Sequence, residues 1–274
     1  MGLFTIDKDT CNKDGLCAAV CPAQIIRQDK DQFPEPVEDA EEICIQCGHC
    51  VAVCPKGSLS HKDMPLAHCP EIRDDLKISP EQTIQFLRNR RSIRVYKDKP
   101  VPRDLLSTLI DTARYAPTGH NSQCVEWMVI DDPNLLKELS GTAVEWMRWM
   151  TQHMADFAAI MHMDRTICRF EDTGEDVILR GAPALIVTHG HKENNFAPAS
   201  CTIALAYLEL AATGLGLGTC FAGYLKAAEN FFPPMKSVLS LPENHECMGA
   251  LMVGYPKFKY TRLPARKEPV ITWR

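Results

Sequence analysis

The amino-acid sequence predicts an α+β fold in two parts: a small cysteine-rich N-terminal domain and a larger domain of helices and strands. The chain of 274 residues is long enough for about two domains. Two cysteine-rich runs lie within its first 54 residues, and beyond them apolar residues recur with helix period in some segments and form short continuous runs in others. We therefore expect a first domain over residues 1–62, a linker over 63–79 and a second domain over 80–274.

The most specific motif is the second cysteine run, which ends in Pro55. Two residues separate each of its first three cysteines, three precede the fourth, and a proline follows, which is the iron–sulfur spacing of bacterial ferredoxins. The run consists of Cys44, Cys47, Cys50 and Cys54. A zinc site more often uses two CxxC pairs set well apart, so zinc and a loop of buried thiols are the less favoured alternatives.

The first cysteine run repeats this pattern about 33 residues earlier, with Asp14 in place of the second cysteine. With this repeat, residues 1–60 resemble a bacterial ferredoxin with two 4Fe-4S clusters. The resemblance implies that Cys44, Cys47, Cys50 and Cys21 hold one cluster, and that Cys11, Cys17 and Cys54 hold the other with Asp14 at its fourth iron. A carboxylate is a harder ligand than a thiolate. The second cluster is therefore either a 4Fe-4S cluster with an aspartate or hydroxide corner, or a 3Fe-4S cluster, and Cys69 is a weaker candidate for the open corner.

The charge is unevenly distributed. Residues 1–60 contain 10 Asp and Glu against 5 Lys and Arg, so this segment alone accounts for the net charge of −5. A solvated acidic face is the simplest interpretation, and docking on a basic partner is the alternative. The excess of acidic over basic residues argues against nucleic-acid binding.

Beyond the linker, Ser79 and Pro80 are typical of a helix start, and a short helix over 81–90 leads into an arginine-rich segment. Arg90, Arg91, Ser92 and Arg94 offer the charge and forked donors that a phosphate monoester requires. On charge alone, a solvated helix end is the more common explanation.

Two further stretches suit a flavin. The loop 113–123 follows a predicted helix over 103–115 and exposes the amides of Asn121 and Gln123, which match a ring edge with both donors and acceptors. A predicted strand over 249–254 leads to a second basic cluster, which contains Arg266 and Lys267.

Together with the glycine-rich segment 214–220, these stretches resemble the nitroreductase family of FMN enzymes across roughly residues 80–270. The resemblance implies an FMN site at a homodimer interface. Arg90, Arg91, Ser92 and Arg94 would bind the phosphate and ribityl chain, and Arg266 with Lys267 would complete the phosphate site. Asn121 and Gln123 would contact the ring, and Gly218 and Thr219 would lie against it. The glycines follow a predicted helix over about 202–212 and not a strand, so they do not form a dinucleotide fingerprint.

The segment 142–170 carries Met and Trp at helical spacing, which usually means core or interface, although the resemblance also suggests a mobile cover over the flavin. Another buried strand is expected over 183–188. His153, His162, His189 and His191 show no metal-ligand spacing.

These observations predict an FMN- and iron–sulfur-dependent oxidoreductase that passes electrons between its clusters and FMN and reduces a small organic electrophile, such as a nitro compound, a quinone or an activated alkene. The alternatives are an electron-transfer or redox-sensing module that serves a protein partner, and an enzyme of the same class for reductive dehalogenation or flavin processing. Ferredoxin or NAD(P)H is the expected donor. No side chain stands out as a catalytic acid, although Tyr96, His120 and Cys220 are candidates. The sequence shows neither a signal peptide nor a membrane span, so we expect a cytoplasmic protein.

Overall fold

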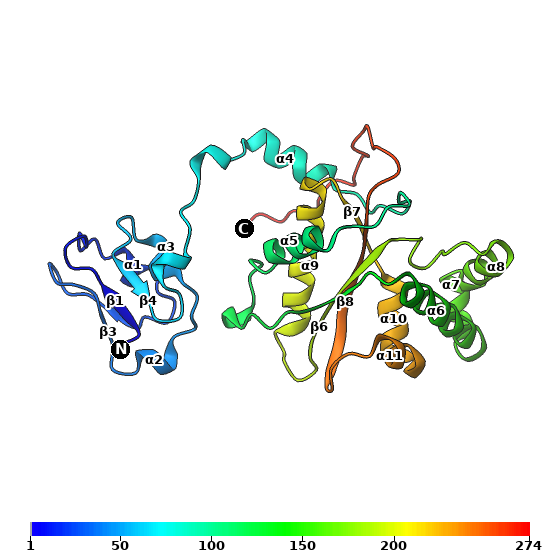
Figure 1. Ribbon diagram of the computed structural model, residues 1–274, viewed down its shortest axis with the longest axis horizontal. Coiled ribbons are helices and arrows are strands. Elements are labelled where there is room, and N and C mark those ends of the chain that lie inside the picture. The colour runs from blue at the N-terminus through cyan, green and yellow to red at the C-terminus, as the bar shows by residue number, and fades with distance from the viewer. Residues whose placement is uncertain (1) are drawn as a thin grey trace. The chain divides into compact units, whose positions relative to one another are not determined.

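A computed structural model describes residues 2–274, and these residues divide into two compact units. The first unit comprises the chain up to Ile78 together with His120–Ser122, and the second comprises Ser79–Gly119 and Gln123–Arg274. Figure 1 labels the elements of both. The predicted α+β class is confirmed.

The first unit is built around two small antiparallel ribbons. Strand β1 (Phe4–Ile6) pairs with β4 (Leu59–His61), so that the two ends of the cysteine-rich segment close on each other. The second ribbon joins β2 (Ile26–Arg27) to β3 (Glu35–Pro36). The helices of this unit are α1 (Leu16–Ala19), α2 (Ala40–Ile43), α3 (His49–Val53) and the 3₁₀ turns η1 (Leu66–His68) and η2 (Asp74–Leu76).

The second unit is organised around a four-stranded antiparallel sheet with the order β5-β6-β8-β7. Its strands are β5 (Glu126–Ile130), β6 (Ala184–His191), β7 (Gly218–Phe221) and β8 (His245–Gly254). The two central strands, β6 and β8, are almost fully buried. This explains their continuous apolar runs, since a strand that is covered on both faces has no solvated side.

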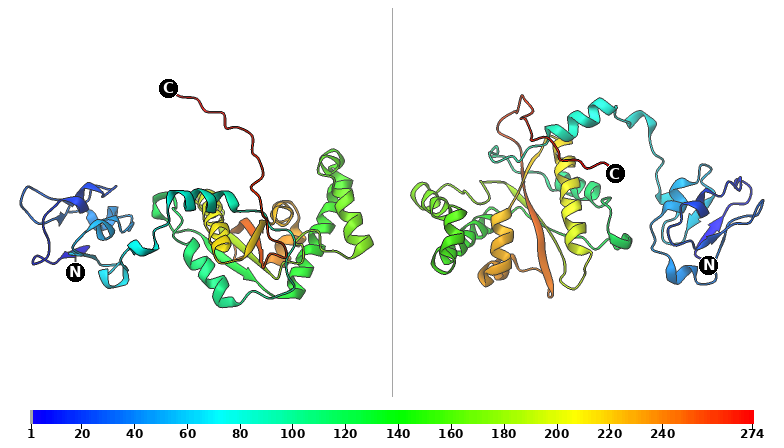
Figure 2. Two further views of the ribbon diagram at one scale, coloured as in Figure 1. Left: turned by 90° about the horizontal axis from the view of Figure 1, so that it is seen from above. Right: turned by 180° about the vertical axis from the view of Figure 1, so that it is seen from behind.

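Helices cover both faces of this sheet (Figures 1 and 2). The helices α5 (Arg103–Ala113) and α9 (Ala197–Gly214) share one core with the even-numbered residues of β6, such as Ile186. The other face carries α6 (Pro133–His153), α10 (Gly223–Phe231) and α11 (Pro233–Leu239), whose core includes Leu185 and Val187. The remaining elements are α4 (Pro80–Asn89), η3 (Gly119–Asn121), α7 (Ala155–Ile160) and α8 (Met163–Thr173).

Local signals in the sequence set several boundaries. Ser79 begins α4 with a capping box, in which its hydroxyl accepts from the Gln82 amide and the Gln82 side chain accepts from the Ser79 amide. The predicted helix over 103–115 is confirmed as α5. The helix expected over about 202–212 is longer, because it already begins at Ala197 with Pro198 in its first turn. Gly218, the last glycine of the glycine-rich segment, is the first residue of β7.

Residues 257–274 form neither helix nor strand and run as an extended tail from the end of β8 (Figure 2). No helix in the described part of the chain combines the length and apolarity that a membrane span requires.

The loop between α8 and β6 is held by one carboxylate. Asp176 accepts hydrogen bonds from the Ser140 hydroxyl (2.9 Å) and from the amides of Ile178 (3.0 Å), Leu179 (2.8 Å) and Gly181 (3.1 Å). The same loop contains Arg180, whose φ of 59° lies in the left-handed region. Asp176 therefore fixes the backbone on either side of Arg180.

We predict that Asp176→Ala lowers the free energy of unfolding of the second unit by roughly 2–3 kcal/mol, because several amides lose a charged acceptor. Urea unfolding of the full chain, followed by tryptophan fluorescence, measures this change. Asp172→Ala, an exposed position on α8, is the matched control and should change stability little. Equal stability of the two variants would show that Asp176 does not hold the loop.

Candidate functional site

The cysteines of the first unit gather in two groups, and each group draws on both runs. Cys21, Cys44, Cys47 and Cys50 line one small cavity, and Cys11, Cys17, Cys54 and Asp14 line another. Such sets of soft donors fit iron–sulfur clusters. Neither group includes Cys69, whose thiol lies 3.6 Å from the carbonyl oxygen of Pro65.

Tight turns place these sulfur atoms. Gly15 (φ 76°) and Gly48 (φ 72°) precede α1 and α3 in the left-handed conformation, which glycine adopts without strain. Backbone amides point at two of the sulfurs: Gln46 N lies 3.4 Å from Cys44 Sγ and Ser58 N lies 3.2 Å from Cys54 Sγ. Burial opposes the thiolate form of Cys54, but the backbone donors around its sulfur outweigh burial and lower its pKa, which favours the form that binds iron.

Burial acts in the opposite direction on other thiols. It raises the pKa of Cys50 to about 11 and also raises the pKa of Cys17, because a thiolate is poorly solvated in these positions. Without a bound metal these cysteines are therefore protonated at neutral pH, so metal binding must release protons.

Asp14 has a local structural role in addition to its place among the cysteines. Its Oδ1 accepts from the amide of Leu16 (3.1 Å), at the start of α1. One carboxylate oxygen is thus engaged in a turn, and Oδ2 is left for another ligand.

His61 is the functional residue of this unit that the sequence did not single out. It is 2% exposed, and its Nε2 lies 3.5 Å from Cys44 Sγ. The amide of Asp63 donates to its Nδ1 (3.1 Å), so in the neutral ring the proton is on Nε2 and points toward the Cys44 sulfur. Burial lowers the pKa of His61, which favours this neutral form.

In the second unit, three of the predicted arginines lie together. Arg90, Arg91 and Arg266 line a depression of about 340 Å³, to which Arg88 also contributes. Arg90 forms an ion pair with the buried carboxylate of Glu209 (3.0 Å), which holds its guanidinium in place. This concentration of forked cationic donors fits a phosphate group. Lys267 lies next to Arg266 on the exposed C-terminal tail.

Ser92, Gly218 and Thr219 lie where the arginine-rich segment meets the sheet edge. Ser92 forms a parallel bridge with Thr219, and the Ile93 amide donates to the Thr219 carbonyl (2.8 Å). A Cβ atom on Gly218 would lie 2.4 Å from Ile93 Cγ1, so only glycine permits this approach. Close packing against Ile93 therefore explains why residue 218 is glycine, whether or not a flavin ring lies against it.

Asn121 and Gln123 fall in different units. Asn121 belongs to the first, where its amide donates to the carbonyls of Ile45 (3.1 Å) and Gln46 (2.9 Å). Gln123, in the second, donates its backbone amide to the hydroxyl of Thr118 (3.0 Å). His120, Asn121 and Gln123 all have φ near 50°, an unusual conformation for non-glycine residues and one that is frequent at functional sites.

The second unit also contains a large apolar cavity of about 550 Å³. Helices α6, α7 and α10 and the strands β7 and β8 supply its walls, and the cationic groups are Arg94 and Arg180. Among the described residues that line it, none is a carboxylate or a histidine. The indole N–H of Trp146 is buried and has no hydrogen-bond partner in the described part of the chain. A cavity of this size and composition suits a small, largely apolar ligand with acceptor atoms.

The methionine- and tryptophan-rich segment supplies both buried core residues and residues that line the cavity. Trp146, Met147 and Met150 are buried core residues, whereas Met154 and Phe157 are 49% and 44% exposed and line the cavity.

Tyr96 and Cys220, the candidate catalytic residues of the second unit, lie in different environments. Tyr96 donates its hydroxyl to the Ile93 carbonyl (2.7 Å), and burial raises its pKa, so it retains its proton and supports the backbone. Cys220 lines the cavity.

Comparison with known proteins agrees with both parts of the resemblance. Residues 87–255 match the model of the nitroreductase family, and residues 3–58 match that of a 4Fe-4S dicluster domain. The chain is 25% identical over 183 residues to the FMN reductase (NAD(P)H) of Bacillus subtilis, covering 67% of this chain and 69% of that protein. It is 23% identical over 238 residues to iodotyrosine deiodinase 1 of Rattus norvegicus, covering 84% of this chain and 74% of that protein.

The N-terminal part is 40% identical over 52 residues to a protein described as ferredoxin 7Fe from Hydrogenibacillus schlegelii, covering 19% of this chain and 60% of the ferredoxin. Among solved structures, an FMN-bound nitroreductase of Desulfitobacterium hafniense has a TM-score of 0.56 at 21% identity, covering 70% of this chain and 96% of its own. The fold of the larger part is therefore shared with that structure.

We predict that His61→Leu lowers the reduction potential of the cluster at Cys44 by on the order of tens of millivolts, because the sulfur loses a hydrogen-bond donor and its negative charge is less well stabilised. Anaerobic redox titration followed by EPR measures the midpoint potential. His49→Leu is the matched control, since His49 bonds to the Cys47 carbonyl and not to a sulfur. An unchanged potential in His61→Leu would show that the contact does not tune the cluster.

Proposed function

The chain belongs to the nitroreductase family, and from this membership we propose that it is an FMN- and iron–sulfur-dependent oxidoreductase that reduces a small organic electrophile, such as a nitro compound, a quinone or an activated alkene. The observation that carries the proposal is the presence, on one chain, of two cluster-ligand sets and of a large apolar cavity with two arginines. When bound, FMN can collect single electrons and deliver them as a hydride equivalent. Joining both parts on one chain raises the effective concentration of the electron donor.

The proposed ligands follow from the donor sets. One cluster is held by Cys21, Cys44, Cys47 and Cys50, and the other by Cys11, Cys17 and Cys54, with Asp14 at the remaining corner. The FMN phosphate and ribityl chain are held by Arg90, Arg91, Ser92, Arg94, Arg266 and Lys267, and the ring by Asn121, Gln123, Gly218 and Thr219. The four-guanidinium depression supports the phosphate assignment. In this proposal residues 1–62 form the cluster domain, residues 80–274 form the FMN domain, and residues 63–79 link them.

The residues that line the cavity suggest how the protein binds its substrate and stabilises the charge that develops during reduction. The apolar side chains exclude water, which strengthens the electrostatic interactions of the polar groups that remain. Arg180 then stabilises the negative charge that develops on substrate oxygen as it is reduced.

The lack of carboxylates and histidines around this cavity, within the described residues, supports an electron-poor substrate over one that needs a positioned general base. For a nitro compound, two electrons and two protons yield the nitroso product and water.

The resemblance further suggests a homodimer, a cytoplasmic location, and ferredoxin or NAD(P)H as the electron donor. The Bacillus subtilis FMN reductase carries NAD(P)H in its name, which supports a nicotinamide donor, while the dicluster domain supports a ferredoxin-type donor.

Reductive dehalogenation is the second candidate reaction. It is favoured by the similarity to iodotyrosine deiodinase 1, which spans 84% of this chain. In this reaction an aryl halide takes up two electrons and one proton, the carbon–halogen bond breaks, and halide leaves. Halide release during anaerobic turnover of a halogenated phenol distinguishes it from nitro reduction.

We expect the anaerobically purified chain, loaded with FMN and clusters, to reduce 4-nitrobenzoate and nitrobenzene when dithionite-reduced ferredoxin is supplied. Cys47→Ala should abolish ferredoxin-driven turnover but leave flavin binding intact, because only the cluster is lost. The proposal fails if the reduced wild-type protein transfers electrons to a protein acceptor alone, which would instead indicate an electron-transfer or redox-sensing module. If NAD(P)H supports full turnover in Cys47→Ala and ferredoxin supports none in the wild type, entry through the clusters is wrong.

In the same assay, Arg180→Gln should raise the KM for the anionic 4-nitrobenzoate about tenfold, corresponding to about 1.4 kcal/mol, while nitrobenzene is affected less. Arg165→Gln, an exposed position on α8, is the matched control. An equal loss with both substrates would show that Arg180 does not recognise charge.

We further predict that the Asp14 corner is labile, so that the purified wild type contains about seven irons per chain and gives the EPR signal of an oxidised 3Fe-4S cluster. Asp14→Cys should raise the content to about eight irons and remove this signal. The ferredoxin relative described as 7Fe supports this expectation. Eight irons in the wild type without a 3Fe-4S signal would show that Asp14 or a hydroxide completes the cluster.

A further inference from the structure

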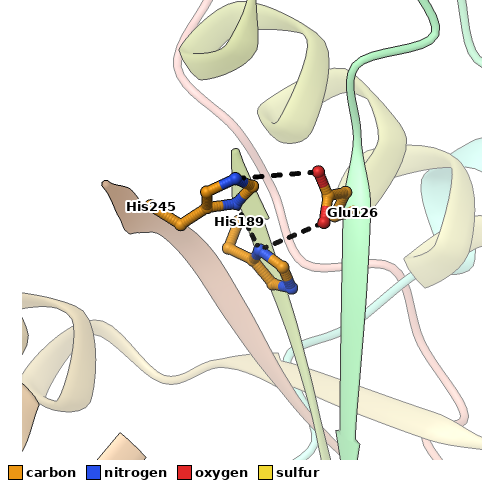
Figure 3. A group of neighbouring side chains, drawn as sticks. All are labelled: Glu126, His189 and His245. Carbon is orange, nitrogen blue, oxygen red and sulfur yellow. Dashed lines mark hydrogen bonds and ion pairs between the residues drawn. The ribbon is translucent and has the colours of Figure 1, made fainter. Parts of the chain in front are cut away.

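Three side chains from three neighbouring strands converge at one end of the sheet of the second unit (Figure 3). They are Glu126 at the start of β5, His189 near the end of β6 and His245 at the start of β8. One potential ligand atom of each lies within 4.8 Å of those of the other two. None of the three lines the apolar cavity or the basic depression.

The sheet register explains this convergence. Glu126 and His189 lie directly opposite each other on β5 and β6, so their side chains share one face. The pairing of β6 with β8 is interrupted by a bulge between Thr188 and His189, beyond which His191 lies opposite His245. Residues two apart on a strand face the same way, so the bulge brings His245 onto the face of His189.

In the absence of an ion the two imidazoles are hydrogen-bonded to each other, whereas the carboxylate lies beyond hydrogen-bond distance from both. The two Nδ1 atoms of His189 and His245 are 3.0 Å apart. Glu126 Oε2 lies 4.0 Å from His189 Nδ1, and Oε1 lies 3.8 Å from His245 Nε2, both too far for hydrogen bonds. In a tetrahedral zinc site, metal–nitrogen bonds of about 2.0–2.1 Å place two ligand nitrogens about 3.4 Å apart.

An ion bound by both imidazoles takes the place of this hydrogen bond, and the two nitrogens separate by a few tenths of an ångström. The Glu126 side chain is 57% exposed, so it is free to rotate inward, whereas the side chains of His189 and His245 are 6% and 13% exposed and held by the sheet. The arrangement thus combines two imidazoles held in fixed positions with one carboxylate on the solvent side that can adjust its position.

The surroundings of His189 favour the neutral imidazole. Burial lowers the pKa of His189, with a further contribution from His245, although Glu126 acts in the opposite direction. A neutral imidazole offers a lone pair to a metal. Two imidazoles and one carboxylate are donors that zinc accepts, whereas calcium and magnesium prefer oxygen ligands.

We propose that Glu126, His189 and His245 form a binding site for one divalent transition-metal ion, best matched by Zn²⁺, which is separate from the iron–sulfur clusters and the flavin site. Three protein ligands leave the fourth tetrahedral position to a water molecule. The ion links β5, β6 and β8 at this end of the sheet and so stabilises the second unit.

The test uses the full chain after anaerobic cluster loading, dialysed against zinc chloride, with zinc and iron counted by mass spectrometry. We expect about one zinc ion per wild-type chain, with zinc X-ray absorption showing nitrogen and oxygen ligands at about 2.0–2.1 Å and no sulfur at about 2.3 Å. Zinc should also raise the thermal unfolding midpoint of the wild type by several degrees, because it binds only the folded state.

His245→Gln and Glu126→Gln should each lose the zinc ion and the thermal shift while retaining their iron. Both positions are less buried than His189, so these variants are expected to fold, and their iron content and ellipticity verify this. Glu246→Gln, a carboxylate on β8 next to His245, is the matched control and should bind zinc as the wild type does. The proposal is overturned if the wild type retains no zinc, if its zinc has sulfur ligands, or if His245→Gln and Glu126→Gln both bind as much zinc as the control.

Discussion

The hydrogen bond from the Ile93 amide to the Thr219 carbonyl fixes the arginine-rich segment on the edge of the central sheet, and both halves of the candidate flavin site depend on it. It requires the backbones to approach so closely that Gly218 can carry no side chain, because a Cβ atom would overlap Ile93. From this anchor, Arg90 and Arg91 extend toward the basic depression, while Arg94 lines the apolar cavity. One short segment thus supplies cations to two chemically different sites, and its position relative to the sheet determines both.

Local patterns explain why much of the architecture could be predicted from the sequence. The capping box at Ser79, the apolar period of α5 and the continuous apolar runs of β6 and β8 are properties of neighbouring residues, and they specify elements without reference to the rest of the chain. The cysteine spacing is equally local, because each loop must direct several sulfurs toward one cluster. The sorting of cysteines between two cavities, in contrast, depends on the closure of β1 on β4. It followed from the family resemblance and not from spacing.

Sites that draw on distant strands were not visible in the sequence. His189 and His245 are 56 residues apart and become neighbours only through the β6–β8 pairing and its bulge. Metal-ligand motifs are defined by short spacings along the chain. A pair this far apart matches none of them, so the sequence did not predict a metal site at these histidines. His61 is similar: its contact with Cys44 depends on the strand that closes the first unit. The large cavity did not follow from helical periodicity, because the same period covers the buried Met150 and the exposed Met154, and both line the cavity.

The position of the metal-ligand cluster along β8 limits what a bound ion can do. Met252 of β8 lines the apolar cavity, whereas His245 lies seven residues earlier on the same strand. At about 3.4 Å per residue, a strand of this length separates the two positions by roughly 20 Å. An ion at His245 is therefore too distant to touch a substrate in the cavity, and its effect must pass through the sheet. β6 and β8 form the shared core of both faces, so strengthening their end pairing stabilises the cavity walls that rest on the same strands. The ion would thus support the redox site mechanically, without taking part in its chemistry.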